Sequence, residues 1–429
     1  MFARCSKSML HGRNRLKIGA KLVQQPRTDF WMQKKVLALA VAGLVSGVAF
    51  AQSNVTVFGV ADAAYTYAKG KTADGATTTA FSGITSGGYK GPRLGFSGEE
   101  ALGNGLKAFF WIEFAYEIDQ DTGIYRNRRS YVGIDTPVGA FSVGRQYNAG
   151  WLQMGRSSSN EVTGINPMNT FVGGSGSGIP TIGGTMATNQ NSRWNNSLVF
   201  TTKDYSGLTG RAIYAFGETA TNQTQSNVPG AATTVVAGAT PATAATSDNG
   251  RLGLSAAYTN GPITADVAFN QRQAIHSQYP TLTGEGMNLD EWYVGGSYNF
   301  NVVKLYASYQ TLTNKNTVAS AIDAKLWSLG ISAPVGTALK LGLEYAAIDY
   351  DQACSKQTVA NCAANANNGK SSGWGVHAKY DLSKRTFFYA SAARFKNDTN
   401  TLAASANGAA AGALGQSNWA VQSGVSHTF

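Results

Sequence analysis

The sequence predicts an all-β protein in which sixteen antiparallel strands close into a barrel. Three observations predict this fold. Stretches of about ten residues alternate between apolar and polar side chains, as strands with two different faces do. The connections between these stretches alternate between short turns and long polar loops. Only 14% of the 429 residues are charged, while the chain holds 50 Gly, 19 Phe, 19 Tyr and 8 Trp, a composition that fits many short strands.

The first 51 residues are expected to precede the barrel. A basic segment at 32–35, an apolar run at 36–45 and the small-residue pattern Ala49-Phe50-Ala51 are typical of a secretory signal peptide. We assign the signal to 32–51, with cleavage near Ala51-Gln52, because the apolar run is too short for a membrane anchor. Residues 1–31 carry seven basic residues ahead of a signal that begins with its own methionine. They are interpreted as a spurious N-terminal extension, and 52–429 as the barrel.

The charge of the chain depends on this leader. The whole sequence has a formal charge of +11, but nine of its 35 basic residues and one of its 24 acidic residues lie in 1–51. The mature chain therefore keeps 26 basic and 23 acidic residues, a formal charge of +3. Such a balance offers no strongly basic face for phosphate neutralisation, and nucleic acid is not an expected partner.

The strand-like alternation is clearest at 106–117, 251–258, 263–270, 303–309 and 339–347. In each stretch one face is apolar and the other carries polar or charged side chains. Charged positions on the polar faces include Lys107, Glu113, Glu117, Arg251, Asp266, Lys304 and Lys340.

Short and long connections follow one another along the chain. Tight turns are predicted at 101–105, 135–140, 204–208, 259–262, 299–302, 333–337 and 381–385, each with Gly, Pro, Asn, Asp or Ser. Long loops are predicted near 68–90, 118–124, 148–190, 218–249, 274–288, 313–321, 351–372 and 397–416. Fifteen connections imply sixteen strands, with both termini at the short-turn end of a closed up-and-down barrel.

The charged face decides between a soluble and a membrane barrel. Sixteen strands enclose a lumen too wide for side chains to fill. Unpaired ions in a dry core would cost several kcal/mol each, so the charged face must meet water and the apolar face must meet lipid. Closure also leaves no unpaired strand edge in hydrocarbon. The sequence therefore predicts a transmembrane β-barrel around an aqueous lumen.

The stretch 148–190 shows neither a helical nor an alternating apolar pattern. A loop that long inside a compact domain is usually functional. Arginine-bearing strands flank it, with Arg126, Arg128 and Arg145 before it and Arg193 after it. We expect the loop to fold into the lumen, to face these arginines and to form the narrow point of a pore. Glu161 is the only carboxylate in the loop and is predicted to face these arginines.

Several motifs resemble the general diffusion porins of Gram-negative bacteria, especially those of beta-proteobacteria. They are VTVFGVAD at 55–62, PRLGFSGEE at 92–100 with LGNGLKA at 102–108, RRSYVGI at 128–134 with GRQY at 144–147, and the terminal GVSHTF at 424–429. The resemblance implies an outer-membrane homotrimer with an inward constriction loop and an arginine ladder on the opposite wall. It places that ladder at Arg93, Arg128 and Arg193, with Arg145 nearby; Arg126 shares strand parity with Arg128.

The C-terminal strand and the cysteines suggest two further features. Trp419, Val421, Val425, His427 and Phe429 alternate toward a terminal aromatic residue, which resembles the signal read by the outer-membrane barrel assembly machinery. His427 and Phe429 are taken as that signal. Cys354 and Cys362, separated by seven residues in a polar loop of an exported chain, indicate a local disulfide rather than a metal site.

The function expected from these features is passive diffusion of ions and small hydrophilic solutes, with a mild preference for anions. One acidic residue facing four or five arginines favours that sign. A substrate-specific channel, for example for sugars or carboxylates, is the alternative, although no continuous aromatic track is visible. An enzyme is disfavoured because His276, His377 and His427 belong to no catalytic motif. No metal or cofactor is expected.

Overall fold

The computed structural model describes residues 54–71, 78–161, 164–171, 192–216, 250–272, 289–314, 322–352, 369–397 and 417–429. All of them belong to one compact unit, Ser53–Phe429. The expected extension and signal, the proposed cysteine pair and His276 lie outside the described residues.

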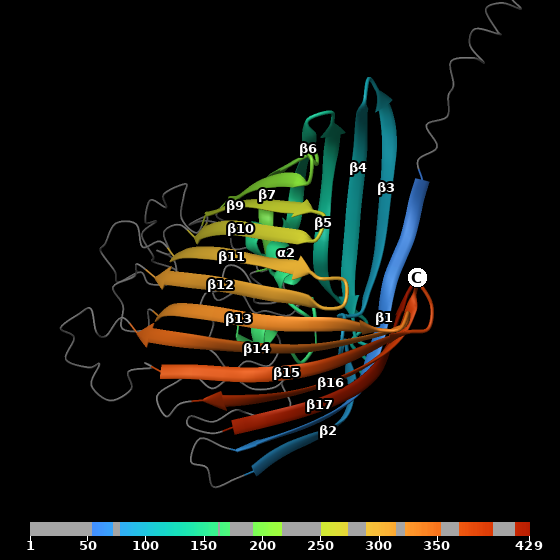
Figure 1. The fold of residues 1–429 in the computed structure, drawn as a ribbon. Helices are drawn as coiled ribbons and strands as arrows, with labels where there is room; N and C mark the ends of the chain where they lie inside the picture. Colours follow the sequence, from blue (N-terminus) through green and yellow to red (C-terminus); the bar gives the residue numbers. More distant parts are fainter. Residues whose placement is uncertain are drawn as a thin grey trace, which may run out of the picture. The chain divides into compact units, whose positions relative to one another are not determined.

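The strands follow one another as antiparallel neighbours (Figure 1). They are β1 (Asn54–Lys71), β2 (Thr78–Ser86), β3 (Arg93–Gly103), β4 (Leu106–Tyr116), β5 (Ile124–Thr136), β6 (Gly139–Tyr147), β7 (Arg193–Thr202), β8 (Leu208–Ala215), β9 (Arg251–Asn260), β10 (Ile263–Arg272), β11 (Leu289–Asn299), β12 (Lys304–Asn314), β13 (Ile322–Val335), β14 (Leu339–Gln352), β15 (Gly369–Asp381), β16 (Thr386–Asn397) and β17 (Ser417–Thr428). β17 pairs back onto β1 from Val60↔Thr428 to Lys69↔Trp419, which closes the barrel.

The seventeen strands of the described chain occupy sixteen positions in the barrel, because β2 and β3 share one. β2 pairs with the second half of β1, reaching Ala63↔Ser86, and β3 pairs with the first half, from Val60↔Arg93. Between the two strands, the buried Asp62 carboxylate accepts hydrogen bonds from the Lys90 backbone N–H at 2.9 Å and from the Tyr389 hydroxyl at 2.6 Å. These bonds fix the segment between β2 and β3, where the strand at this barrel position is interrupted.

The predicted long loop near 68–90 is therefore wrong. β1 continues to Lys71 and β2 occupies much of the remainder. The β2 segment, TTAFSGITS, carries too few apolar residues for a clear alternating pattern, and its pairing with β1 determines its structure instead. The long loop expected at 351–372 is also shorter at both ends, because β14 extends to Gln352 and β15 begins at Gly369.

The two faces of the barrel differ as a membrane barrel requires. On β17 the outward Val421 and Val425 are 39% and 40% exposed, whereas Asn418, Gln422 and Ser426 are buried on the other face. Leu254, Val267 and Leu343 are likewise exposed at outward positions of β9, β10 and β14. Sixteen strands with apolar side chains outward and polar ones inward confirm the predicted transmembrane barrel.

The segment after β6 enters the barrel and is partly helical. It forms α2 (Ala149–Met154), the 3₁₀ turn η1 (Gly155–Ser157) and α3 (Pro167–Phe171). The Asn148 side chain caps α2 by accepting a hydrogen bond from the Trp151 backbone N–H at 2.8 Å. The sequence of 148–190 shows no helical pattern, because helices this short leave little periodicity in a sequence.

The inward course of this segment follows from its packing. Met154, Met168 and Phe171 are buried in one cluster with the inward-facing Ala346 and Ile348 of β14 and Phe395 of β16. The Phe171 and Phe395 rings meet edge to face with centroids 5.8 Å apart. Within the described residues, no helix has the length and apolar character needed to cross a membrane.

Candidate pore constriction

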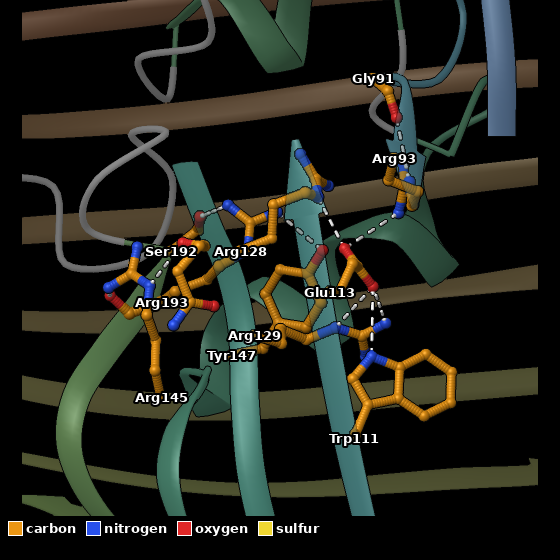
Figure 2. Close-up of polar contacts among 11 residues, drawn as sticks. Gly91, Arg93, Trp111, Glu113, Arg128, Arg129, Arg145, Tyr147, Ser192 and Arg193 are labelled. Carbon is orange, nitrogen blue, oxygen red and sulfur yellow. Dashed lines mark hydrogen bonds and ion pairs between the residues drawn. The ribbon is translucent and has the colours of Figure 1, made fainter. Parts of the chain in front are cut away.

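Three arginines converge on one buried carboxylate of the barrel wall, Glu113 on β4 (Figure 2). Arg128 Nε lies 2.6 Å from Glu113 Oε1, and Arg93 Nη1 lies 3.7 Å from the same oxygen. Arg129 donates to Glu113 Oε2 through Nε at 3.0 Å and also through Nη2. Three guanidinium groups therefore share a single negative charge, and the cluster keeps a net positive charge of about two.

A strand irregularity brings the consecutive Arg128 and Arg129 to the same carboxylate. In a regular strand, successive side chains point to opposite faces. Here Glu113 is the register partner of Arg129, while the next residue, Phe114, is the partner of Asn127. Arg128 is thus the extra residue of a β-bulge, which changes the direction of its side chain.

Tyr147, the last residue of β6, lies beside a second part of the cluster. Arg193 donates through Nη2 to the Tyr147 hydroxyl at 2.8 Å, and its guanidinium carbon lies 4.5 Å from the ring centroid. The guanidinium of Arg129 lies 5.0 Å from the same ring. The aromatic ring thus contacts two cations, which cation–π attraction favours.

The other two predicted wall arginines have different surroundings. Arg145 lies at a register irregularity between β6 and β7, donates to the Asn127 carbonyl at 3.0 Å and also donates to the Asn195 side chain. It therefore ties β5 to β7. Arg126 is the register partner of Ala115 on β4, next to the Glu113 cluster.

No contact between Glu161 and the wall arginines is found within the described part of the chain, so its predicted position opposite them stays a prediction. Glu161 is exposed, has a backbone φ of 54° and lies near Lys340 of β14. The carboxylate that contacts the arginine cluster is Glu113, which the sequence had identified only as a lumenal residue. A period-two pattern shows which face Glu113 occupies but gives no information on which strands lie beside it.

The inserted segment is attached to the wall formed by β9 to β16. Arg156 Nε lies 2.7 Å from Asp266 of β10. Glu344 of β14 is fully buried and accepts from the Ser158 hydroxyl at 2.7 Å and the Ser159 backbone N–H at 2.8 Å. His377 Nε2 lies 3.0 Å from the Ser159 carbonyl. These contacts hold the segment inside the lumen.

The remaining charged positions predicted to be lumenal lie on several strands. Lys107 pairs with Glu99 at 3.3 Å near a short turn, and Lys304 lies 5.1 Å from the Tyr306 ring. Arg251 lies 6.0 Å from the Trp194 ring, and Glu117 follows directly after β4. None of these is among the described contacts of Glu113.

The C-terminal residue completes the closure of the barrel. Gly59 and Phe429 exchange two backbone hydrogen bonds, of 3.0 and 3.2 Å. The Phe429 ring covers Gly59 so closely that a Cβ there would lie 2.2 Å from it. His427 Nδ1 lies 2.8 Å from the Thr386 hydroxyl, and its ring stacks near Phe429 with centroids 6.5 Å apart.

Comparison with known proteins agrees with this architecture. The sequence profile of the Gram-negative porin family matches residues 38–400. The chain belongs to this family. It is 31% identical to outer membrane porin protein 32 of Delftia acidovorans over 93% of this chain and 100% of that protein. An outer membrane porin protein of Bordetella pertussis is 27% identical over 85% of this chain and 95% of that protein.

A solved structure supports the same conclusion. The anion-selective porin from Comamonas acidovorans superposes with a TM-score of 0.67 at 28% identity, covering 88% of this chain and all of that one. The protein is therefore an outer-membrane porin, a passive diffusion channel and not an enzyme. The beta-proteobacterial resemblance inferred from the sequence motifs is confirmed.

Proposed function

We propose that this porin conducts ions and small hydrophilic solutes with a mild preference for anions, set by Arg93, Arg128, Arg129 and Arg193. The observation that carries the proposal is the charge imbalance at Glu113, where one carboxylate contacts three guanidinium groups. Arg193 adds a fourth positive charge through Tyr147. Rings of Arg and Lys side chains favour anions in aqueous pores.

The arrangement also supports diffusion without tight binding. Arg128 and Arg129 donate to Glu113 and Arg193 donates to Tyr147, so these side chains are held against the wall and a passing anion meets a fixed positive field. The related porin from Comamonas acidovorans is anion-selective. Its selectivity supports the sign proposed for the present channel.

Paired arginine substitutions test the role of the cluster. In planar bilayers with a potassium chloride gradient, Arg93→Gln with Arg128→Gln should shift the reversal potential toward potassium selectivity. The matched control is Lys384→Gln with Arg385→Gln, which removes two cations from the exposed turn between β15 and β16. An equal shift in both variants would show that general surface charge, not the cluster, sets selectivity.

Four further features belong to the same proposal. Porins commonly form trimers, and we infer a homotrimer here, measurable by light scattering of the detergent-solubilised protein. Residues 32–51 are proposed to be the signal peptide, and N-terminal sequencing should begin at Gln52. Cys354 and Cys362 are proposed to form a disulfide, and His427 with Phe429 to serve in recognition by the assembly machinery.

A further inference from the structure

A row of outward aromatic side chains follows the barrel near its long-loop end. Tyr309 on β12 is the register partner of Trp327 on β13, and Tyr345 on β14 is the register partner of Trp374 on β15. The Trp327 and Tyr345 rings join these two pairs, with centroids 5.3 Å apart. Each is 38–43% exposed on the apolar face. Tyr and Trp rings at such positions lie at the headgroup level of a membrane barrel. The row therefore indicates where lipid headgroups begin.

Cations interrupt this row on the next three strands. Arg394 on β16 is the register partner of both Trp374 on β15 and Trp419 on β17. Trp419 is in turn the register partner of Lys69 on β1. Register partners share a face, so Arg394 and Lys69 point outward with the two tryptophans. Lys396 lies two residues beyond Arg394 on the same face, and all three cations are exposed.

These cations differ from their neighbours in having no acidic partner among the described residues. At the same end of the barrel, Lys370 on β15 pairs with Asp349 at 3.4 Å, and Lys325 is the register partner of Asp349. No ion pair of Lys69, Arg394 or Lys396 occurs within the part of the chain that the structure describes. A positive patch is thus left on a face otherwise suited to lipid.

The surface is hollowed at this patch. A groove of about 660 Å³ is lined by Lys69, Arg394, Trp374, Trp419 and Val421, with small residues such as Ala392 between them. Small side chains leave room between the two tryptophans, and the cations border that room. The groove combines positive charge with apolar and aromatic walls, so it suits an amphipathic anion better than a fully hydrated one.

We propose that this groove binds the phosphorylated headgroup of a membrane lipid in the outward-facing leaflet. Long loops of such barrels lie on the extracellular side, which places the groove in that leaflet. Arg394 presents a planar donor fork that matches phosphate oxygens, and Lys69 adds a point charge. The flanking tryptophans contact the boundary between headgroup and acyl chains.

Native mass spectrometry of the full-length porin in detergent tests the proposal, with diphosphorylated lipid A as the probe. Lys69→Gln with Arg394→Gln should reduce bound lipid A at least tenfold. The control, Lys325→Gln with Lys370→Gln, removes two outward cations at the same end of the barrel and should change binding by less than twofold. Lipid A stripped of its phosphates should bind the unmodified porin weakly.

Three outcomes would overturn the proposal. They are unchanged binding in the Lys69 and Arg394 variant, equal binding of the dephosphorylated lipid, and displacement by millimolar inorganic phosphate, which would indicate a free-anion site. Loss of the oligomer in that variant without added lipid would assign the groove to a subunit contact instead. Reversal potentials should stay unchanged in both variants, because their side chains face outward, so this test is independent of the selectivity proposal.

Discussion

Substitution of Glu113 by Gln should increase the anion preference of the channel. The change keeps the size of the side chain and removes the single negative charge that three arginines share. The formal charge of that group rises from +2 to +3. Anions in the adjacent lumen are then attracted more strongly and cations are repelled more strongly.

The expected size follows from Coulomb's law. A unit charge about 8 Å from a permeating ion contributes about 0.5 kcal/mol in a water-like dielectric, or about a twofold change in ion occupancy. Chloride occupancy should rise about twofold and potassium occupancy should fall about twofold, so the chloride-to-potassium permeability ratio should rise about fourfold. A lower dielectric near the wall would enlarge the effect, and screening by the electrolyte would reduce it.

The assay is the reversal potential of reconstituted channels in a potassium chloride gradient. Glu99→Gln is the matched control, since Glu99 is an exposed carboxylate paired with Lys107 near a short turn. It lies six residues from Arg93 on β3, about 20 Å along the strand. A Glu113→Gln channel that became less anion-preferring, or that shifted no more than Glu99→Gln, would refute the reasoning.

Three other substitutions test gating, stability and selectivity. Glu344→Ala removes the acceptor of the hydrogen bonds from Ser158 and Ser159, each of which contributes about 1.5–3 kcal/mol if the carboxylate is charged. The variant channel should therefore close at a lower voltage in planar bilayers. An unchanged closing voltage would contradict the anchoring role of Glu344. Gly59→Ala forces a Cβ to 2.2 Å from Phe429 and should lower the temperature of heat-induced mobility change on gels, at a cost of about 1–3 kcal/mol, whereas Gly210→Ala, with its nearest neighbour at 3.4 Å, should not. Arg129→Gln should shift selectivity toward potassium, in the direction expected for Arg93→Gln with Arg128→Gln. If Arg129→Gln leaves selectivity unchanged, Arg129 is not part of the charged constriction.

Much of the fold could be predicted because barrel strands leave a local signal. Alternation at 106–117 and 339–347 follows directly from one face meeting lipid and the other water, and turn residues give the strand ends. The β2 segment could not be found this way. Its structure depends on pairing with β1, and nothing in the sequence of either segment identifies the other as its partner.

The candidate site was only partly predictable for a related reason. Parity placed Arg128 on the lumenal face and, by the same rule, Arg129 on the other. The bulge opposite Phe114 changes this geometry, and no residue type in that stretch indicates it. The pairing of the arginines with Glu113 depends on how the strands lie beside one another in space.

The sign of the reversal potential of the unmodified channel tests the central claim most directly. Purified protein in a planar bilayer, with a tenfold potassium chloride gradient, should conduct. Its reversal potential should have the same sign as the chloride equilibrium potential. A clear potassium preference would contradict the positive constriction. Insertion without any conductance would contradict the water-filled lumen itself.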